Sequence, residues 1–343
     1  MAYEVTIGIP VYNVEKYIAQ TIESVLAQTF ESVEFLFCDD CGTDKSMEIV
    51  KHFQQSHPRG KDIHTVSQPF NKGLGEARNR MLAVAQGRYI YFMDSDDTIA
   101  PNTIELLYSK AQQYDADIVY GSMRKVLLYD NGKEIHIKHP AKVFLGENEF
   151  AEYAYSRYDA MPASTCNFLI RMDVYRQNNL QYQPINYWED FTFTMDLPAY
   201  VNRVVLLPDL TYNYLCRFDS LSNYAQRDHI SKDEILTTMR AISNLKSRSE
   251  QLSDRTYFSQ RMWKLMMTCF YVVCSVLRNE KLITPSFSKR ELRDFMQYPI
   301  PFSAICSFPK WRLKHFALYL LGVMPSTLSV MFVKFVAKRK GLI

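Results

Sequence analysis

The amino-acid sequence predicts an α/β fold: a Rossmann-like, mostly parallel sheet flanked by helices, followed by a mainly helical C-terminal region. Over roughly the first 120 residues, short runs of β-branched and aromatic residues alternate with segments of helical periodicity. This alternation favours right-handed βαβ units, and therefore a parallel sheet covered on both faces. From about residue 229 onward the periodicity is helical. We therefore expect a first domain over residues 1–225 and a helical region over residues 226–343.

The expected elements follow in order along the chain. Ile18, Ile22 and Val25 have helical spacing and fill the first connection between strands. Asp130-Asn131-Gly132 separates two apolar-rich segments and predicts a β-hairpin turn. A helix is expected directly after residues 188–190. Strands are expected at residues 5–9, 33–37, 63–66, 89–93, 118–120, 204–207 and 212–215.

Composition excludes several broad classes of protein. The 343 residues are 47% hydrophobic and 22% charged, which is enough apolar content to build a core. The net charge of +3 argues against a general nucleic-acid binder, which would carry a large basic excess. The seven cysteines are odd in number and widely scattered, and the N-terminus lacks the pattern of a signal peptide. A reduced, cytoplasmic setting is expected.

Polar side chains gather where the predicted strands end. Tyr12-Asn13 follows the first strand, Asp39-Asp40 the second, and a run of acidic residues the fourth. In open parallel sheets, ligands bind beyond the carboxyl ends of the strands. We therefore expect these segments to form one binding site.

The acidic run Asp94-Ser95-Asp96-Asp97 is a candidate metal and phosphate site. Clustered carboxylates repel one another, so a cation is needed to compensate their charge. Mg²⁺ and Mn²⁺ take oxygen ligands and often bind only one or two protein carboxylates beside a diphosphate. A solvated turn and helix cap is the alternative for such a string. Its position at a buried strand end favours the metal site.

Two other motifs carry less information. Gly73-x-Gly75 lacks the third glycine of a dinucleotide fingerprint, has Arg78 in that place, and does not follow the first strand. A nicotinamide or flavin site is therefore not expected. Cys38-x-x-Cys41 has no second Cys or His pair at metal-site spacing, so a zinc site is not expected. Cys38 is interpreted as a buried strand end and Cys41 as a turn residue.

Five strings in order resemble the family 2 glycosyltransferases of the GT-A fold, over roughly residues 4–225. The family's strings are of the kind P-x-Y-N, D-D-G-S-x-D, A-R-N, D-x-D-D and E-D, and Cys41-Gly42 stands where the family usually has Gly-Ser. The strings in this chain are IPVYNVEKYI (9–18), DDCGTDKS (39–46), NKGLGEARN (71–79), YIYFMDSDD (89–97) and YWED (187–190).

The resemblance implies a set of donor-binding residues. The nucleotide pocket would be shaped by the first string, with the uracil edge read by Asp39. Asp96 would ligate Mg²⁺ or Mn²⁺ bridging the diphosphate, and Asp94 would hold the ribose or a metal-bound water. Arg217 would close over the diphosphate together with Ser220, and a surface loop is the alternative for this segment, in which Leu215 replaces the first Arg of the family's string. The remaining expected donor contacts are Pro10, Tyr12, Asn13, Glu15, Arg78 and Ser95.

The resemblance also implies the acceptor side. Asp190, in the pair Glu189-Asp190, would be the general base that takes the proton from the acceptor hydroxyl. Attack from the face opposite the leaving nucleotide gives inversion. Trp188 would stack on an acceptor sugar, with Tyr158 and Tyr187 as further platform candidates. A helix cap is the alternative role for the acidic pair, and both roles can coexist because carboxylates stabilise helix starts.

The C-terminal tail, residues 309–343, has its own composition. It carries seven Lys or Arg and no Asp or Glu, so the rest of the chain has a net charge of −4. Two apolar segments, interrupted at Pro325 and bounded by basic residues, fit an anchor that lies on an anionic membrane surface. A helical pair packed on the catalytic domain is the alternative.

The sequence as a whole favours a metal-dependent, inverting glycosyltransferase. It would use a nucleotide sugar, most simply UDP-linked, and a glycan or lipid-linked acceptor in surface polysaccharide biosynthesis at the inner face of the cell membrane. A sugar nucleotidyltransferase is the alternative enzyme, but it would need a Gly-rich basic loop after the first strand, where Pro10-Val11-Tyr12-Asn13 stands. A non-catalytic nucleotide-sugar-binding protein would have lost Asp96 or Asp190, and both are present.

Overall fold

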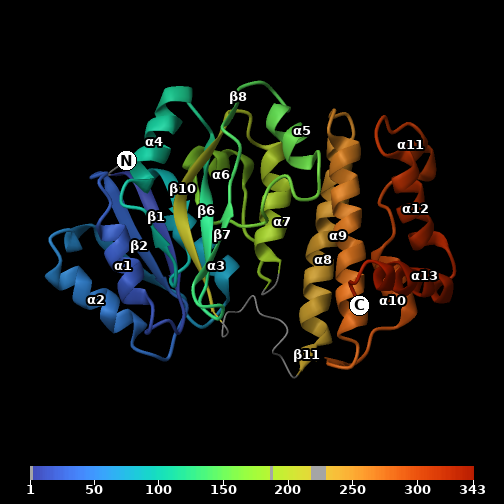
Figure 1. Ribbon diagram of the computed structural model, residues 1–343, viewed down its shortest axis with the longest axis horizontal. Coiled ribbons are helices and arrows are strands. Elements are labelled where there is room, and N and C mark those ends of the chain that lie inside the picture. Colours follow the sequence, from blue (N-terminus) through green and yellow to red (C-terminus); the bar gives the residue numbers. More distant parts are fainter. Residues whose placement is uncertain (1–2, 186–187, 218–228) are drawn as a thin grey trace. The chain divides into compact units, whose positions relative to one another are not determined.

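The computed structural model describes residues 3–185, 188–217 and 229–343. The chain divides into two compact units, which Figure 1 shows in sequence colours. The first comprises residues 1–150 and 163–223, and the second comprises residues 151–162 and 224–343. The short segment 151–162 therefore belongs with the C-terminal unit, which the sequence analysis did not anticipate. The expected boundary near residue 225 lies outside the described residues.

Among the described residues, the first unit is built on a ten-stranded mixed sheet. Eight strands follow the order β3-β2-β1-β4-β9-β6-β10-β5, while β7 pairs with β6 and β8 pairs with β10. The strands β3, β2, β1 and β4 pair in parallel, as their alternation with helices predicts. β9 runs antiparallel to both β4 and β6, and β10 runs parallel to β6. The predicted α/β fold class is confirmed. The strands are β1 Tyr3–Val11, β2 Val33–Asp39, β3 Ile63–Ser67, β4 Gly87–Phe92, β5 Thr98–Ile99, β6 Ile118–Leu127, β7 Lys133–Ile137, β8 Lys142–Phe144, β9 Phe168–Arg171 and β10 Val204–Cys216.

Helices connect the parallel strands and bury their apolar stripes. In α1, Ile18, Ile22 and Val25 are fully buried, which confirms the interpretation of their spacing. β1 and β2 are buried along nearly their whole length, as expected for strands covered on both faces. The helices of this unit are α1 Ile18–Leu26, α2 Ser46–Ser56, α3 Leu74–Val84, α4 Thr103–Tyr114, α6 Met172–Asn178 and α7 Glu189–Asp196, and α5 Glu149–Tyr155 crosses into the second unit.

The hairpin and the last strand show where local sequence does and does not decide the structure. β6 and β7 pair antiparallel, and the turn has positive φ at Asn131 (50°) and Gly132 (73°), as predicted. The two short strands expected near residues 204–207 and 212–215 form one long strand, β10. Its register against β6 shifts between Leu206 and Tyr212, around exposed Pro208. Proline lacks the N–H that the ladder needs, so the strand passes it as a bulge.

The second unit is helical. α9 is its central helix and contacts α8, α12 and α13. Segment 151–162 packs here through Tyr155, whose Oη accepts a hydrogen bond of 2.7 Å from the buried Arg261 Nη1. No helix within the described ranges is long and apolar enough to cross a membrane. The helices are α8 Lys232–Ser249, α9 Phe258–Arg278, α10 Lys289–Phe295, α11 Phe302–Cys306, α12 Arg312–Val323 and α13 Ser326–Arg339, and β11 Ile230–Ser231 pairs with β12 Ile283–Thr284.

Candidate active site

The polar strand ends meet at one edge of the sheet. The parallel register pairs Val11 with Asp39 and Gly8 with Phe92, so β1, β2 and β4 end side by side. The loops that carry Tyr12-Asn13, Asp39-Asp40 and the acidic run therefore lie together, as the sequence predicts. Tyr12 is 43% exposed and available to a ligand, whereas Pro10 is buried in β1.

Several of the expected nucleotide-pocket residues hold the loop itself. Asn13 has a φ of 52°, and its Oδ1 accepts a hydrogen bond of 2.7 Å from the Thr43 backbone N–H. Glu15 Oε2 accepts from the Lys45 backbone N–H at 3.0 Å. Asp39 Oδ1 accepts from Gly42 N–H at 3.3 Å and closes the turn. These side chains shape the loop from residue 39 to residue 46.

The glycine-rich segment before α3 has a structural role. Asp40 is buried, and its two carboxylate oxygens accept from the backbone N–H groups of Lys72 and Gly73, both at 2.9 Å. Gly73 has a φ of 84°, where a side chain would be strained. A Cβ on Gly75 would lie 2.5 Å from the Gln183 carbonyl oxygen. The two glycines therefore permit a close packing that sets the position of α3.

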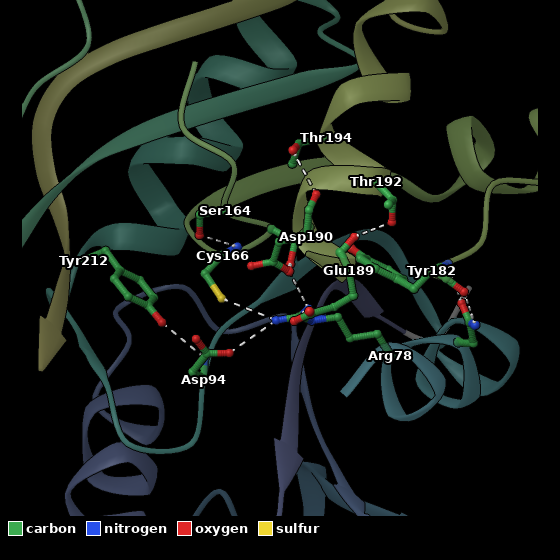
Figure 2. Close-up of polar contacts among 12 residues, drawn as sticks. Arg78, Asp94, Ser164, Cys166, Tyr182, Glu189, Asp190, Thr192, Thr194 and Tyr212 are labelled. Atoms are coloured by element: carbon green, nitrogen blue, oxygen red, sulfur yellow. Dashed lines mark hydrogen bonds and ion pairs between the residues drawn. The ribbon is translucent and has the colours of Figure 1, made fainter. Parts of the chain in front are cut away.

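Arg78 on α3 lies buried among carboxylates (Figure 2). Its guanidinium is 1% exposed; Nη1 pairs with Asp190 Oδ1 at 2.7 Å, and Nη2 pairs with Asp94 Oδ1 at 3.3 Å. Burial lowers the pKa of Arg78, but the two carboxylates raise it above its usual value. The expected contact of Arg78 with the base or diphosphate has no support in this geometry. Instead, Arg78 joins two carboxylates that lie 96 residues apart in the chain.

The acidic run after β4 contains three differently placed carboxylates. Desolvation, reinforced by repulsion from Asp96 and Asp190 and opposed by Arg78, raises the pKa of Asp94 to about 6. Asp96 Oδ2 accepts from Arg217 Nη2 at 2.6 Å and from Nε at 2.8 Å. Ser95 is buried, and its backbone carbonyl accepts a hydrogen bond from Thr21 at 2.9 Å.

Asp97 is an anchor that the sequence analysis did not assign. It is fully buried; its Oδ2 accepts from Tyr212 Oη at 2.6 Å, and its Oδ1 accepts from Leu215 N–H at 2.8 Å. Tyr212 Oη in turn accepts from the Asp94 N–H at 3.1 Å. Burial and the neighbouring Asp94 and Asp96 raise the pKa of Asp97 above its usual range. These bonds fix the carboxylate loop to β10.

Glu189 and Asp190 begin α7, as predicted, after Trp188 in the left-handed region with a φ of 65°. Asp190 Oδ1 accepts from Arg78 and, at 2.5 Å, from Thr165 Oγ1. Glu189 is 13% exposed and lies 3.9 Å from Arg78 Nη1. Burial, with the charge of Asp190 added, raises the pKa of Glu189 to about 7.

The acceptor candidates are less closely defined by contacts. Trp188 is half-buried and meets Phe191 edge-on, with ring centroids 5.5 Å apart. Tyr158 belongs to the second unit, where its hydroxyl lies 3.3 Å from Thr268 Oγ1. Tyr187 and Ser220 lie outside the described residues.

Thr165 and Cys166 are site residues that sequence reasoning missed. Thr165 is fully buried and donates to the candidate base, and Cys166 Sγ lies 3.9 Å from Arg78 Nη2. Both belong to a segment without periodic pattern, so no signal in one sequence marked them. All seven cysteines are free, with Cys38 buried at the end of β2 and Cys41 in the turn, as interpreted.

Two carboxylates of the acidic run are the candidate ligands of a divalent metal. Within the described part of the chain, no group of three or more His, Cys, Asp or Glu side chains converges as a metal site. Asp94 and Asp96 supply two carboxylates, and in this structure each is paired with an arginine, Asp94 with Arg78 at 3.3 Å and Asp96 with Arg217 at 2.6 Å. Mg²⁺ and Mn²⁺ often take only one or two protein carboxylates and complete their shell with phosphate and water. Asp94 and Asp96 are two such carboxylates.

Comparison with known proteins gives partial matches in sequence. The chain is 37% identical over 122 residues to glycosyltransferase GlyG of Streptococcus pneumoniae, covering 36% of this chain and 40% of that protein. It is 28% identical over 234 residues to glycosyltransferase EpsJ of Bacillus subtilis, covering 66% of this chain and 67% of that protein. It matches 16% of the length of S. pneumoniae glycosyltransferase GlyA, at 40% identity and over 35% of this chain. The chain thus spans less than half of the length of GlyG and about a sixth of the length of GlyA.

The fold also matches a solved structure along nearly its whole length. The crystal structure of Staphylococcus aureus TarS residues 1–349 in complex with UDP-GlcNAc superimposes with a TM-score of 0.59 at 19% identity, covering 98% of this chain and 92% of that one. At this identity the likeness shows the fold. A sequence model described as glycosyl transferase family 2 matches residues 6–178, which contain most of β1, the acidic run and Arg78. The chain belongs to glycosyl transferase family 2.

Proposed function

We propose that this protein transfers a sugar from a nucleotide donor, UDP-linked, to an acceptor hydroxyl with inversion at the anomeric carbon. The observation that carries the proposal is the convergence of Asp94 and Asp190 on the single buried guanidinium of Arg78. One carboxylate belongs to the nucleotide-binding edge of the sheet and the other begins a helix. Family membership and the UDP-GlcNAc in the TarS structure support the choice of donor.

The donor would bind over the ends of β1, β2 and β4. Tyr12 would contact the nucleotide with its exposed ring, and Asp39 would accept from the uracil N–H. Pro10, Asn13 and Glu15 would act by shaping the loop, as their position in β1 and their hydrogen bonds indicate.

Asp94 and Asp96 would hold a divalent ion, Mn²⁺ or Mg²⁺. Such an ion neutralises the charge that develops on a leaving nucleoside diphosphate. In this structure Arg217 neutralises Asp96 through two hydrogen bonds, both donated to Oδ2. We propose that Arg217 exchanges this carboxylate for the diphosphate when the donor binds, while Ser95 keeps the loop in place through its backbone.

Asp190 would be the general base. Arg78 and Thr165 both bind its Oδ1, which fixes the carboxylate and leaves Oδ2 for the acceptor hydroxyl. A base on the side opposite the leaving group directs the acceptor oxygen to that face of the anomeric carbon, which gives inversion. A positioned base contributes about 10²–10⁴-fold to the rate. Glu189 would raise the negative potential at the base, and Trp188 would offer one ring face to the acceptor sugar.

We further propose a glycan or lipid-linked acceptor, in surface polysaccharide biosynthesis at the inner face of the cell membrane. A relative with 27% identity over 68% of this chain is named poly(ribitol-phosphate) β-N-acetylglucosaminyltransferase TarS, which supports a polymer as the acceptor class. The basic, apolar composition of residues 309–343 supports a peripheral position on the membrane.

A donor panel tests the proposal directly. UDP-, GDP- and dTDP-sugars are incubated with the protein, and nucleotide release is measured with EDTA and then with added Mn²⁺. We expect release from a UDP-sugar, loss in EDTA, recovery with Mn²⁺ and a strong decrease in Asp96→Asn. Absence of release from every nucleotide sugar contradicts the transfer activity, and full release in EDTA contradicts the metal requirement alone.

A further inference from the structure

The second unit ends in two helices, α12 and α13 (Figure 1). Both helices carry exposed apolar side chains. On each helix these side chains recur every three to four residues or at multiples of that spacing, so they lie along one face of that helix. We call this set the outer stripe. Its members and their exposed fractions are Leu313 (82%), Leu320 (52%), Val323 (52%), Leu328 (55%), Met331 (60%), Phe332 (49%) and Phe335 (54%).

The outer stripe is not the packing face of these helices. α12 buries Leu318 and Leu321 and contacts α9, α10 and α11. α13 buries Val330 and Val333 and contacts α9, α10 and α12. A surface helix ordinarily has one apolar stripe facing the core and a polar face toward water. Here both faces are apolar, so the outer stripe needs a partner of its own.

Basic side chains accompany the outer stripe. Lys338, Arg339 and Lys340 are exposed at the end of α13. At the start of α12, the Lys314 ammonium lies 5.3 Å from the Trp311 ring and 5.4 Å from the Trp263 ring. Apolar residues flanked by lysines, arginines and tryptophans are typical of helices that lie in the boundary of a lipid bilayer.

We propose that the outer stripe docks on an anionic lipid bilayer, with α12 and α13 lying along the membrane surface. Charge decides the occupant: residues 309–343 carry seven basic and no acidic side chains, and one of the seven, Lys334, pairs with Glu280 at 3.0 Å. The same face of a second copy would therefore repel this one, whereas anionic headgroups attract it. The proposal rests on the membrane position proposed above, not on the transfer reaction, and names the face that would bring this chain to a lipid-linked acceptor. Vesicle binding needs neither donor nor acceptor, so the two proposals can fail separately.

Vesicle flotation of the full chain tests the proposal. Vesicles of phosphatidylcholine alone are compared with vesicles that also contain phosphatidylglycerol. We expect binding only to the latter, weakened by added salt. The double variant Met331→Gln/Phe335→Gln should lose binding about tenfold or more, because two outward apolar groups no longer enter the bilayer. The triple variant Lys338→Gln/Arg339→Gln/Lys340→Gln should lose on the order of 100-fold in affinity for these vesicles.

A matched control separates the outer stripe from general surface hydrophobicity. Phe70 is 62% exposed and lies in the first unit, so Phe70→Gln removes a comparable exposed apolar group from elsewhere. We expect Phe70→Gln to bind vesicles as the wild type does. All variants change exposed side chains, and an unaltered circular dichroism melt verifies that they fold. The proposal is overturned if the wild type does not bind vesicles, or if the Met331/Phe335 variant binds them equally well. It is also overturned if the wild type forms an oligomer without vesicle affinity and the Met331/Phe335 variant is monomeric.

Discussion

Arg78→Met is expected to destabilise the first unit strongly, because it leaves two carboxylates without their shared cation. Arg78 is 1% exposed and pairs with Asp190 at 2.7 Å and with Asp94 at 3.3 Å. Removing one partner of a buried ion pair costs about 3–5 kcal/mol. Asp94 and Asp190 are 35% and 27% exposed, so water recovers part of their hydration and favours the lower end, about 3 kcal/mol. For a unit of this size, that lowers Tm by roughly 6–12 °C.

Urea unfolding and calorimetry measure this loss, with Arg80→Met as the control. Arg80 is exposed on the same helix, and its replacement should change stability by less than about 0.5 kcal/mol. Adding Asp190→Asn to Arg78→Met should restore part of the stability, because it removes one of the unpaired charges. If Arg78→Met were as stable as Arg80→Met, Arg78 would not hold the carboxylates as described.

Two further predictions concern the same cluster. The pKa of Glu189 is raised from 4.5 to about 7, so folding disfavours its charged form and the wild type loses stability as pH rises between those values. Glu189→Gln should therefore become more stable relative to the wild type as pH rises through this window, by up to roughly 3 kcal/mol at its upper end. Urea unfolding of both proteins at about pH 4.5 and about pH 7 measures the change, and a difference that does not depend on pH would contradict the shift. Thr165→Val should lower kcat about 10- to 100-fold with little change in KM, since only the hydrogen bond to Asp190 is lost, whereas Thr165→Ser should keep kcat; equal losses in both variants would argue against that bond.

The edge of the sheet where the polar strand ends meet could be predicted because its signals are local. Apolar runs such as the one from Val5 to Ile9 are long enough to identify a buried strand, and polar residues at their ends mark the edge where ligands bind. The turn at Asn131-Gly132 was predictable for the same reason, since both residues tolerate positive φ.

The partners of the charged side chains could not be predicted, because they depend on long-range packing. Helical spacing places Arg78 on α3, but its partner Asp190 lies 112 residues further along the chain. Asp96 was expected to bind a metal and is paired with Arg217, 121 residues away. Thr165 lies in a segment with no periodic pattern, and only the folded chain brings its hydroxyl to Asp190.

The central claim is that Asp190 is the base of a sugar transfer, and turnover by Asp190→Asn tests it most directly. The measurement is nucleotide release with the accepted donor and acceptor, alongside donor affinity by calorimetry, with Asp173→Asn, an exposed acid on α6, as the control. We predict that Asp190→Asn lowers kcat by about 10²–10⁴-fold while donor affinity stays near that of the wild type, and that Asp173→Asn changes neither. Wild-type turnover in Asp190→Asn would contradict the account.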